Sequence, residues 1–310
     1  MKIRLLWSVV LCAVAVVASA APADVGYAPP ETNLIVRVNG PRIRRSRAFE
    51  LVRKSPRFSR IEKDAQRDLE KLGVAFDDLL DTDIFVFVFI DAGGRDKAAQ
   101  PCFNMVARSG KPLAGTALAW LDTQIEPGDW RTFAKDPVDG KPARVLKDEF
   151  TSLAVIALEK DLVQYSMNTR CAALTPRPPV AFAKFMEPEA MLSVACRMDE
   201  VADEEFCRRL PPEYAQFSQF VVGLRTAAVN ILDDGDRIRI GAELAYSDEE
   251  RAKMVTSQLN GMVFALMFAL SDKDPEKVAV LRKLRIVFRE HKVVIAFSCR
   301  NEELERAVTE

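Results

Sequence analysis

The chain has 310 residues, of which 49% are hydrophobic and 29% are charged, a balance typical of folded proteins with apolar cores. This length allows one large domain or two of ordinary size. The formal net charge of −1 is close to neutral. We therefore expect no polyanionic partner such as nucleic acid.

The first twenty residues have the pattern of a secretory signal peptide. Lys2 and Arg4 give a positive start, an uncharged and largely apolar stretch covers residues 5–18, and the Ala-Ser-Ala at 18–20 is a small-x-small cleavage site. We predict cleavage after Ala20 and export of a soluble mature chain to the periplasm or the extracellular space. Such a location argues against cytoplasmic metabolism and again against nucleic acid.

Three correspondences between the halves of the chain predict an internal duplication. Residues 30–36 (PETNLIV) resemble residues 188–194 (PEAMLSV), and Lys-Asp-Pro at 135–137 recurs at 273–275. Residues 154–174 align without gaps on residues 284–304. Because the three matches keep the same order along the chain, we interpret them as two degenerate copies of one unit.

The first copy is expected to begin with a strand at 34–38, in which apolar residues alternate with a period of two. A helix follows, with apolar residues along one face from position 58 to position 72 and Gly73 at its end. The next strand, at 84–90, is apolar throughout and therefore central in its sheet. A strand hairpin at 154–167 closes the copy.

The second copy is expected to begin with a strand at 192–196. Asp-Asp-Gly-Asp at 233–236 then forms a hairpin turn, and the strand at 238–245 leads to a helix with Ser247 and Glu250 as a capping box. A second hairpin at 285–299 turns near residues 290–292. The sequence thus predicts an α+β fold of two ferredoxin-like β-α-β-β-α-β(β) repeats, with antiparallel sheets and helices packed on one face.

The expected boundaries follow from these elements. Residues 1–20 are the signal peptide, residues 21–174 the first repeat, residues 175–187 a proline-rich linker, and residues 188–310 the second repeat. A leader, a proline-led PETNLIVRV strand and a second degenerate copy resemble uncharacterised exported bacterial proteins built from two α+β repeats. The resemblance implies an envelope location and a repeat architecture.

The longest apolar run after the leader covers nine residues, 262–270, whereas a membrane-spanning helix needs about twenty. We therefore expect no transmembrane segment after signal removal. A helix through this run has no polar stripe and must be covered on all sides. Packing between the repeats is the favoured explanation, with a subunit interface or a lipid as alternatives.

Five cysteines remain after cleavage, and no two of them form a CxxC pair. Buried thiols are one interpretation. Cys196 and Cys299 are the candidate disulfide. Each shares one strand face with the alternate apolar residues of its strand, and the first and last core strands of a ferredoxin-like sheet are neighbours.

No pattern of residues predicts a catalytic, cofactor-binding or metal-binding site. His291, the single histidine, falls at a predicted hairpin tip and is interpreted as a surface residue. The acidic clusters at 77–83 and 233–236 are explained by turns and helix ends, since the second lacks the ligand spacing of an EF-hand. Nucleotide-binding glycine motifs and a nucleophile elbow are absent from the sequence.

Basic residues gather after the first strand, where residues 37–71 hold twelve basic and five acidic side chains. Arg42, Arg44, Arg45 and Arg47 lie within six positions. Arginine suits phosphate and carboxylate groups, so this cluster is a candidate site for an anionic envelope component. The alternative interpretation is an ordinary solvated surface.

The leading hypothesis is therefore an exported, non-catalytic protein that acts through protein or envelope contacts. The sequence leaves two alternatives open. One is a carboxylate-dependent hydrolase or lyase with a site between the repeats, and the other is a carrier of an apolar ligand held beneath the helix at 262–270.

Overall fold

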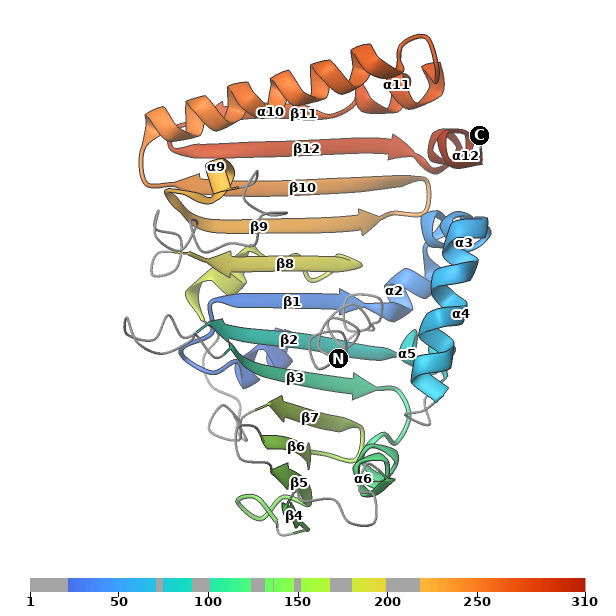
Figure 1. Cartoon of the computed structure of the whole chain (residues 1–310), viewed down its shortest axis with the longest axis vertical. Coiled ribbons are helices and arrows are strands. Elements are labelled where there is room, and N and C mark those ends of the chain that lie inside the picture. The colour runs from blue at the N-terminus through green and yellow to red at the C-terminus, as the bar shows by residue number, and fades with distance from the viewer. Residues whose placement is uncertain are drawn as a thin grey trace. The chain divides into compact units, whose positions relative to one another are not determined.

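Figure 1 shows a computed structural model of the chain, which describes residues 22–70, 75–90, 101–123, 132–135, 137–147, 152–167, 180–198 and 218–309. The chain divides into two compact units. The first holds residues up to Arg45 and Pro56–Ala183, and the second holds Ser46–Ser55 and Lys184–Glu310. The leader and the expected linker core at 175–179 lie outside the described residues.

The first unit is an antiparallel sheet with short helices. Its strands lie in the order β1-β2-β3-β7-β6-β5-β4. The strands are β1 (Leu34–Asn39), β2 (Thr82–Ile90), β3 (Pro101–Ser109), β4 (Thr132–Ala134), β5 (Ala143–Lys147), β6 (Ser152–Ala157) and β7 (Leu162–Met167). The helices are η1 (Pro22–Tyr27), α2 (Gly40–Arg45), α4 (Pro56–Glu70), α5 (Phe76–Leu79) and α6 (Ala114–Thr123), and η3 (Ala181–Phe185) leads out of the unit.

The second unit has the strand order β11-β12-β10-β9-β8. Its strands are β8 (Leu192–Arg197), β9 (Leu224–Asp233), β10 (Arg237–Tyr246), β11 (Arg285–Arg289) and β12 (Lys292–Arg300). Its helices are α3 (Arg47–Arg53), α9 (Ser218–Val221), α10 (Glu249–Leu270), α11 (Pro275–Leu281) and α12 (Asn301–Thr309). The mixed α+β class and the antiparallel sheet are as expected.

The two units share one order of strand pairing. In each, the first strand pairs with the second, the second with the third, the third with the hairpin-closing strand, and that strand with its hairpin partner. Leu34 and Leu192 therefore begin strands at equivalent sheet positions. Val163 and Val293, aligned by the sequence match, are both fully buried.

The ferredoxin-like arrangement itself was a wrong expectation in one respect. In the second unit, β9 and β10 separate the first strand β8 from the last strand β12. The first three strands of each unit instead pair in chain order. In the second unit the turn at 233–236 joins β9 directly to β10, so these two strands form a hairpin that lies between β8 and β12.

The candidate disulfide is not formed, and both Cys196 and Cys299 are free. Cys196 is in register with Ala227 of β9, whereas Cys299 is opposite Ile238 near the other end of β10. Three strand spacings of about 4.8 Å separate β8 from β12, far more than a disulfide can bridge. The prediction depended on the wrong strand order.

Local predictions in both units are largely confirmed. The central strand β2 pairs on both sides and buries residues 84–87. Residues 233–236 form the β9–β10 turn, in which Gly235 has a φ of 94°. Helix α10 begins one residue later than expected: Asp248 is its N-cap and accepts a hydrogen bond from the backbone N–H of Arg251, while Ser247 bonds to Asp248.

The second helices of the two repeats pack on their sheets through equivalent positions. Ala117 and Leu121 of α6 lie in the core with Val155 and Val163. The sequence correspondence places Val255 and Leu259 of α10 at the same two positions, and both pack in the second core. The amino half of α10 is thus the counterpart of α6.

The two units divide inside the expected linker, and one segment of the expected first repeat lies in the second unit. The units divide between Ala183 and Lys184, within the expected linker. Ser46–Ser55, expected in the first repeat, belongs to the second unit. The reason is Asp233, whose carboxylate accepts hydrogen bonds from the Ser46 hydroxyl and the Ala48 backbone N–H.

Candidate functional site

The carboxyl half of α10 exposes large apolar side chains. We call Met262–Leu270 the apolar segment. The exposed fractions of Met262, Phe264, Leu266 and Phe268 are 53%, 68%, 48% and 76%. The other residues of the second unit therefore leave these four side chains uncovered.

The exposed residues of the apolar segment cover more than half of the helix circumference. At 100° per residue, Phe264 and Phe268 fall on one flank, and Met262 and Leu266 fall on the opposite flank. Ala265 and Ala269, both exposed, lie between the flanks. Only the remaining side of the helix, with Val263, Met267 and Leu270, is half-buried. The segment is thus a convex apolar ridge.

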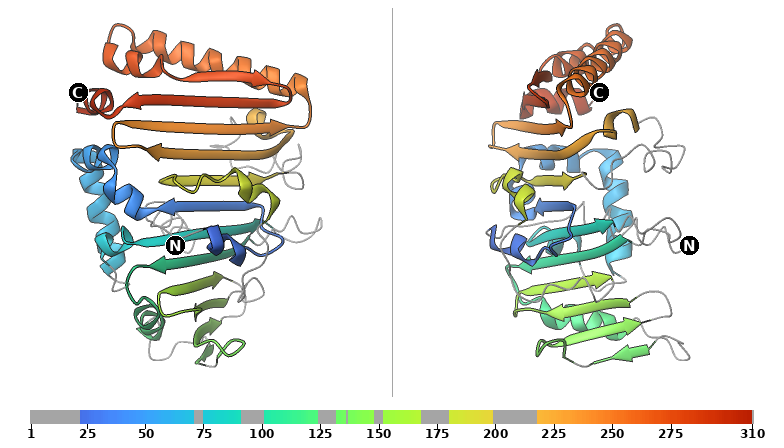
Figure 2. Two further views of the ribbon diagram at one scale, coloured as in Figure 1. Left: turned by 180° about the vertical axis from the view of Figure 1, so that it is seen from behind. Right: turned by 90° about the vertical axis from the view of Figure 1, so that its left-hand side faces the viewer.

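The apolar segment extends beyond the strand beside which α10 packs. Asn260, just before the segment, donates a hydrogen bond of 3.2 Å to the carbonyl oxygen of Ile286, the second residue of β11. Because α10 and β11 run in opposite directions, the ten helical residues after Asn260 lie past the start of β11. Figures 1 and 2 show α11 beside this end of α10.

The extension has no counterpart in the described part of α6. By the same correspondence, Thr123, where α6 ends, matches Gly261 of α10. The residues next in sequence, 124–131, read QIEPGDWR and include a Pro-Gly pair that is unfavourable in a helix. Within its described residues, the first unit thus builds an equivalent core without an apolar extension.

By length and composition alone, α10 is long and apolar enough to cross a membrane. The expectation that no membrane-spanning segment follows the leader was based on the nine-residue apolar run alone and not on the full length of the helix. The helix gains its length from residues 249–261, which include Ala252 and Val255 in the core of the second unit.

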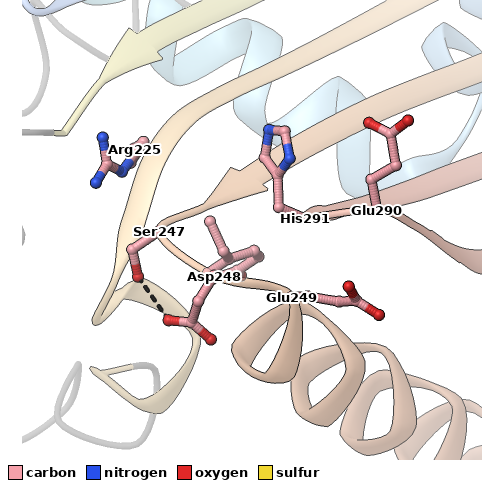
Figure 3. Close-up of a pocket in the computed structure, with 7 residues that line it drawn as sticks. Arg225, Ser247, Asp248, Glu249, Glu290 and His291 are labelled. Carbon is pink, nitrogen blue, oxygen red and sulfur yellow. Dashed lines mark hydrogen bonds between the residues drawn. The ribbon is translucent and has the colours of Figure 1, made fainter.

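A cavity of about 490 Å³ lies at the opposite, amino end of α10 (Figure 3). Its walls come from the β9 start, the β10–α10 junction and the β11–β12 turn. The lining residues are Arg225, Tyr246, Ser247, Asp248, Glu249, Glu290 and His291. Three carboxylates and one arginine make this cavity acidic.

The side chains of the cavity have local structural tasks. Hydrogen bonds from the backbone of Arg251 and from the Ser247 hydroxyl lower the pKa of Asp248, which keeps this N-cap ionised. Burial raises the pKa of Tyr246 to about 12, and its hydroxyl donates to the carbonyl oxygen of Phe220. Ser247 turns toward Asp248 rather than His291 (Figure 3). These contacts do not assemble an activated nucleophile.

His291 is exposed at the β11–β12 turn, as the sequence predicts. The acidic residues before β2 and at its start are engaged in ion pairs: Asp78 with Lys111, Asp81 with Arg44 and Lys111, and Asp83 of β2 with Arg37. Within the described ranges, no group of three or more histidine, cysteine, aspartate or glutamate residues could hold a metal ion.

The four arginines are divided between two helices. Arg42, Arg44 and Arg45 end α2 in the first unit, whereas Arg47 begins α3 in the second. Arg44 forms an ion pair with Asp81, and Arg42 is half-buried. The ion pair of Arg44 with Asp81 counts against a part for Arg44 in the candidate anion site.

No family model matches the chain, and no curated protein matches it. Crystal forms III, IV and I of TP0453 are similar solved structures, with identities of 12%, 12% and 11% and TM-scores of 0.44, 0.42 and 0.42. Each match covers 94% of this chain and 98% of that chain. Similarity at this level leaves the function to be argued from the residues of this chain.

Proposed function

We propose that this chain is an exported, non-catalytic protein that acts through apolar contact with another component of the envelope. The observation that carries the proposal is the exposure of Met262, Phe264, Leu266 and Phe268 on α10. Contiguous apolar patches on a protein surface mark sites of protein or membrane contact.

The comparison of the two repeats supports a role for the apolar segment beyond folding. The core positions of α10, Val255 and Leu259, precede the segment and match those of α6. A helix that ended near Gly261 would keep these core contacts. The apolar extension is thus best explained by a contact made with something outside the described residues.

The proposal is tested by fractionating the envelope of cells that export the chain. We expect the unaltered chain to sediment with envelope membranes and to resist a high-salt wash, because apolar contacts are not screened. The variant Phe264→Gln/Phe268→Gln should move to the soluble fraction. Glutamine favours helix at least as well as phenylalanine, so α10 should persist.

A matched control replaces two exposed residues in the amino half of the same helix, Met254→Gln/Ser257→Gln. This variant should sediment like the unaltered chain. An unaltered chain found wholly in the soluble fraction would contradict the proposed function.

Export is a separate prediction from the leader. The exported protein should begin at Ala21 or within one or two residues of it, because Ala18 and Ala20 satisfy the small-residue rule of signal peptidase. Intact-mass measurement on the purified exported chain checks the start. Recovery of the full-length chain from the cytosol would refute the prediction.

A further inference from the structure

We infer that the partner of the apolar segment is a lipid bilayer, which Met262–Leu270 enters from one side without crossing it. This inference rests on the proposed function and names the partner of the same surface. The shape of the ridge, its length and the charges beside it favour a bilayer.

The shape of the ridge fits a fluid apolar phase. The two phenylalanines lie on one flank of α10 and Met262 and Leu266 on the other, with exposed alanines between them. A flat protein surface could cover one flank, and the other flank would stay in water. Lipid chains can surround a convex ridge on every exposed side.

The ridge is too short to cross a bilayer. Nine helical residues extend about 14 Å at 1.5 Å per residue, roughly half of a hydrocarbon core of about 30 Å. Polar residues bound it at both ends: Asn260 is bonded to Ile286, and Ser271, Asp272 and Lys273 follow the segment. The remainder of α10 is held by Ala252 and Val255 in the protein core.

A helix that lies at the membrane surface in this way has one face on the protein and the other in the acyl region. Val263, Met267 and Leu270 supply the protein-facing side and are half-buried. The exposed ridge then supplies the lipid-facing side. The geometry assigns α10 to the class of interfacial helices rather than spanning helices.

Exposed basic side chains lie on the elements that follow the ridge. They are Lys273 after α10, Arg282 at the end of α11 and Arg285 at the start of β11. Asp274 forms an ion pair with Lys277, and Glu303 forms one with Lys283. Asp272, beside Lys273, is an exposed acid, so the three cations outnumber it. Phosphate headgroups would meet the exposed cations, so anionic lipid should strengthen binding that the apolar ridge already supports.

The test is binding of the purified exported chain to protein-free vesicles, measured by flotation. We expect binding to phosphatidylcholine vesicles and tighter binding to an equal mixture of phosphatidylcholine and phosphatidylglycerol. Salt should weaken only the additional binding to the anionic mixture. Phe264→Gln/Phe268→Gln should reduce binding to both vesicles by about 100-fold, since two large apolar side chains lose their burial.

The matched control Met254→Gln/Ser257→Gln should bind as the unaltered chain does. Circular dichroism of both variants establishes that α10 is folded in each. Equal vesicle binding by the phenylalanine variant and the unaltered chain would overturn the inference.

Failure of the bilayer assignment is distinguishable from failure of the proposed function. If the chain sediments with envelope membranes in a Phe264-dependent manner but does not float with protein-free vesicles, the partner is a protein and the bilayer is excluded. If it does neither, both proposals are wrong.

Discussion

Replacing Arg37 by methionine should destabilise the first unit by about 3–5 kcal/mol, because the substitution leaves the charge of Asp83 buried without its cation. Arg37 on β1 lies 3.6 Å from Asp83 on β2, and the side chains are only 6% and 0% exposed. The guanidinium also lies 5.4 Å from the ring centre of Phe85. Urea unfolding with a probe in the first unit measures the loss.

The double variant Arg37→Met/Asp83→Leu tests whether the lost stability comes from the uncompensated buried charge or from changed packing. We expect it to recover most of the lost stability, since an apolar pair of similar volume replaces a buried ion pair at little cost. Arg67→Met is the surface control, because Arg67 and Asp64 are 68% and 70% exposed and their ion pair contributes at most about 1 kcal/mol. A single variant as stable as the unaltered chain would contradict the argument.

The strands and turns of this chain could be predicted because their signals are local. The apolar run at 84–90 indicated a central strand, and β2 occupies that position between β1 and β3. Asp-Asp-Gly-Asp at 233–236 indicated a turn. Gly235 adopts a positive φ in this turn, a conformation that glycine takes at little cost. The match between 154–174 and 284–304 aligned Val163 with Val293, and both are buried in the structure.

The strand order and the membership of α3 could not be predicted, since both depend on contacts distant in sequence. The hydroxyl of Ser46 reaches Asp233 across 187 positions, and neither residue is unusual in its local sequence. A period-two pattern indicates which side chains of a strand face the core, but it does not indicate which other strand pairs with it. The disulfide expectation for Cys196 and Cys299 failed for this reason.

The sequence indicated only part of the candidate site. The lack of a polar stripe at 262–270 showed that the helix needs a cover there. It could not show whether the second unit supplies that cover, because hydrophobicity is the same for a core and for a contact surface. The decisive observation is structural: Phe264 and Phe268 are exposed.

Asp233→Ala should destabilise the second unit by about 3 kcal/mol, with a fall of about 10 °C in the midpoint of its thermal transition. The carboxylate accepts hydrogen bonds from the Ser46 hydroxyl at 2.6 Å and from the Ala48 backbone at 3.1 Å. It also accepts from the Gly235 backbone at 2.8 Å and the Asn301 amide at 3.2 Å. Alanine removes all four, and α3 loses its attachment to the β9–β10 turn.

The control is Asp236→Ala in the same turn, whose exposed side chain should contribute within about 0.5 kcal/mol. Differential scanning calorimetry of the two variants gives the comparison. Equal midpoints for Asp233→Ala and Asp236→Ala would show that the four hydrogen bonds do not hold α3.

The contribution of Asp233 should also depend on pH. Burial by itself would raise the pKa of Asp233, but the hydrogen bonds from Ser46, Ala48, Gly235 and Asn301 outweigh it and lower the pKa below its ordinary value. A carboxyl whose pKa is lower in the folded state stabilises that state above its unfolded pKa of about 4, and this contribution is lost as the pH falls toward the folded pKa. The stability difference between the unaltered chain and Asp233→Ala should therefore be constant from neutral pH to about pH 5 and shrink below about pH 4. If the stability difference stayed constant through the acid range, the ionised form of the Asp233 carboxylate would not be what holds Ser46–Ser55. The Ser46 hydroxyl and the backbone and side-chain amide donors would then be satisfied without its charge.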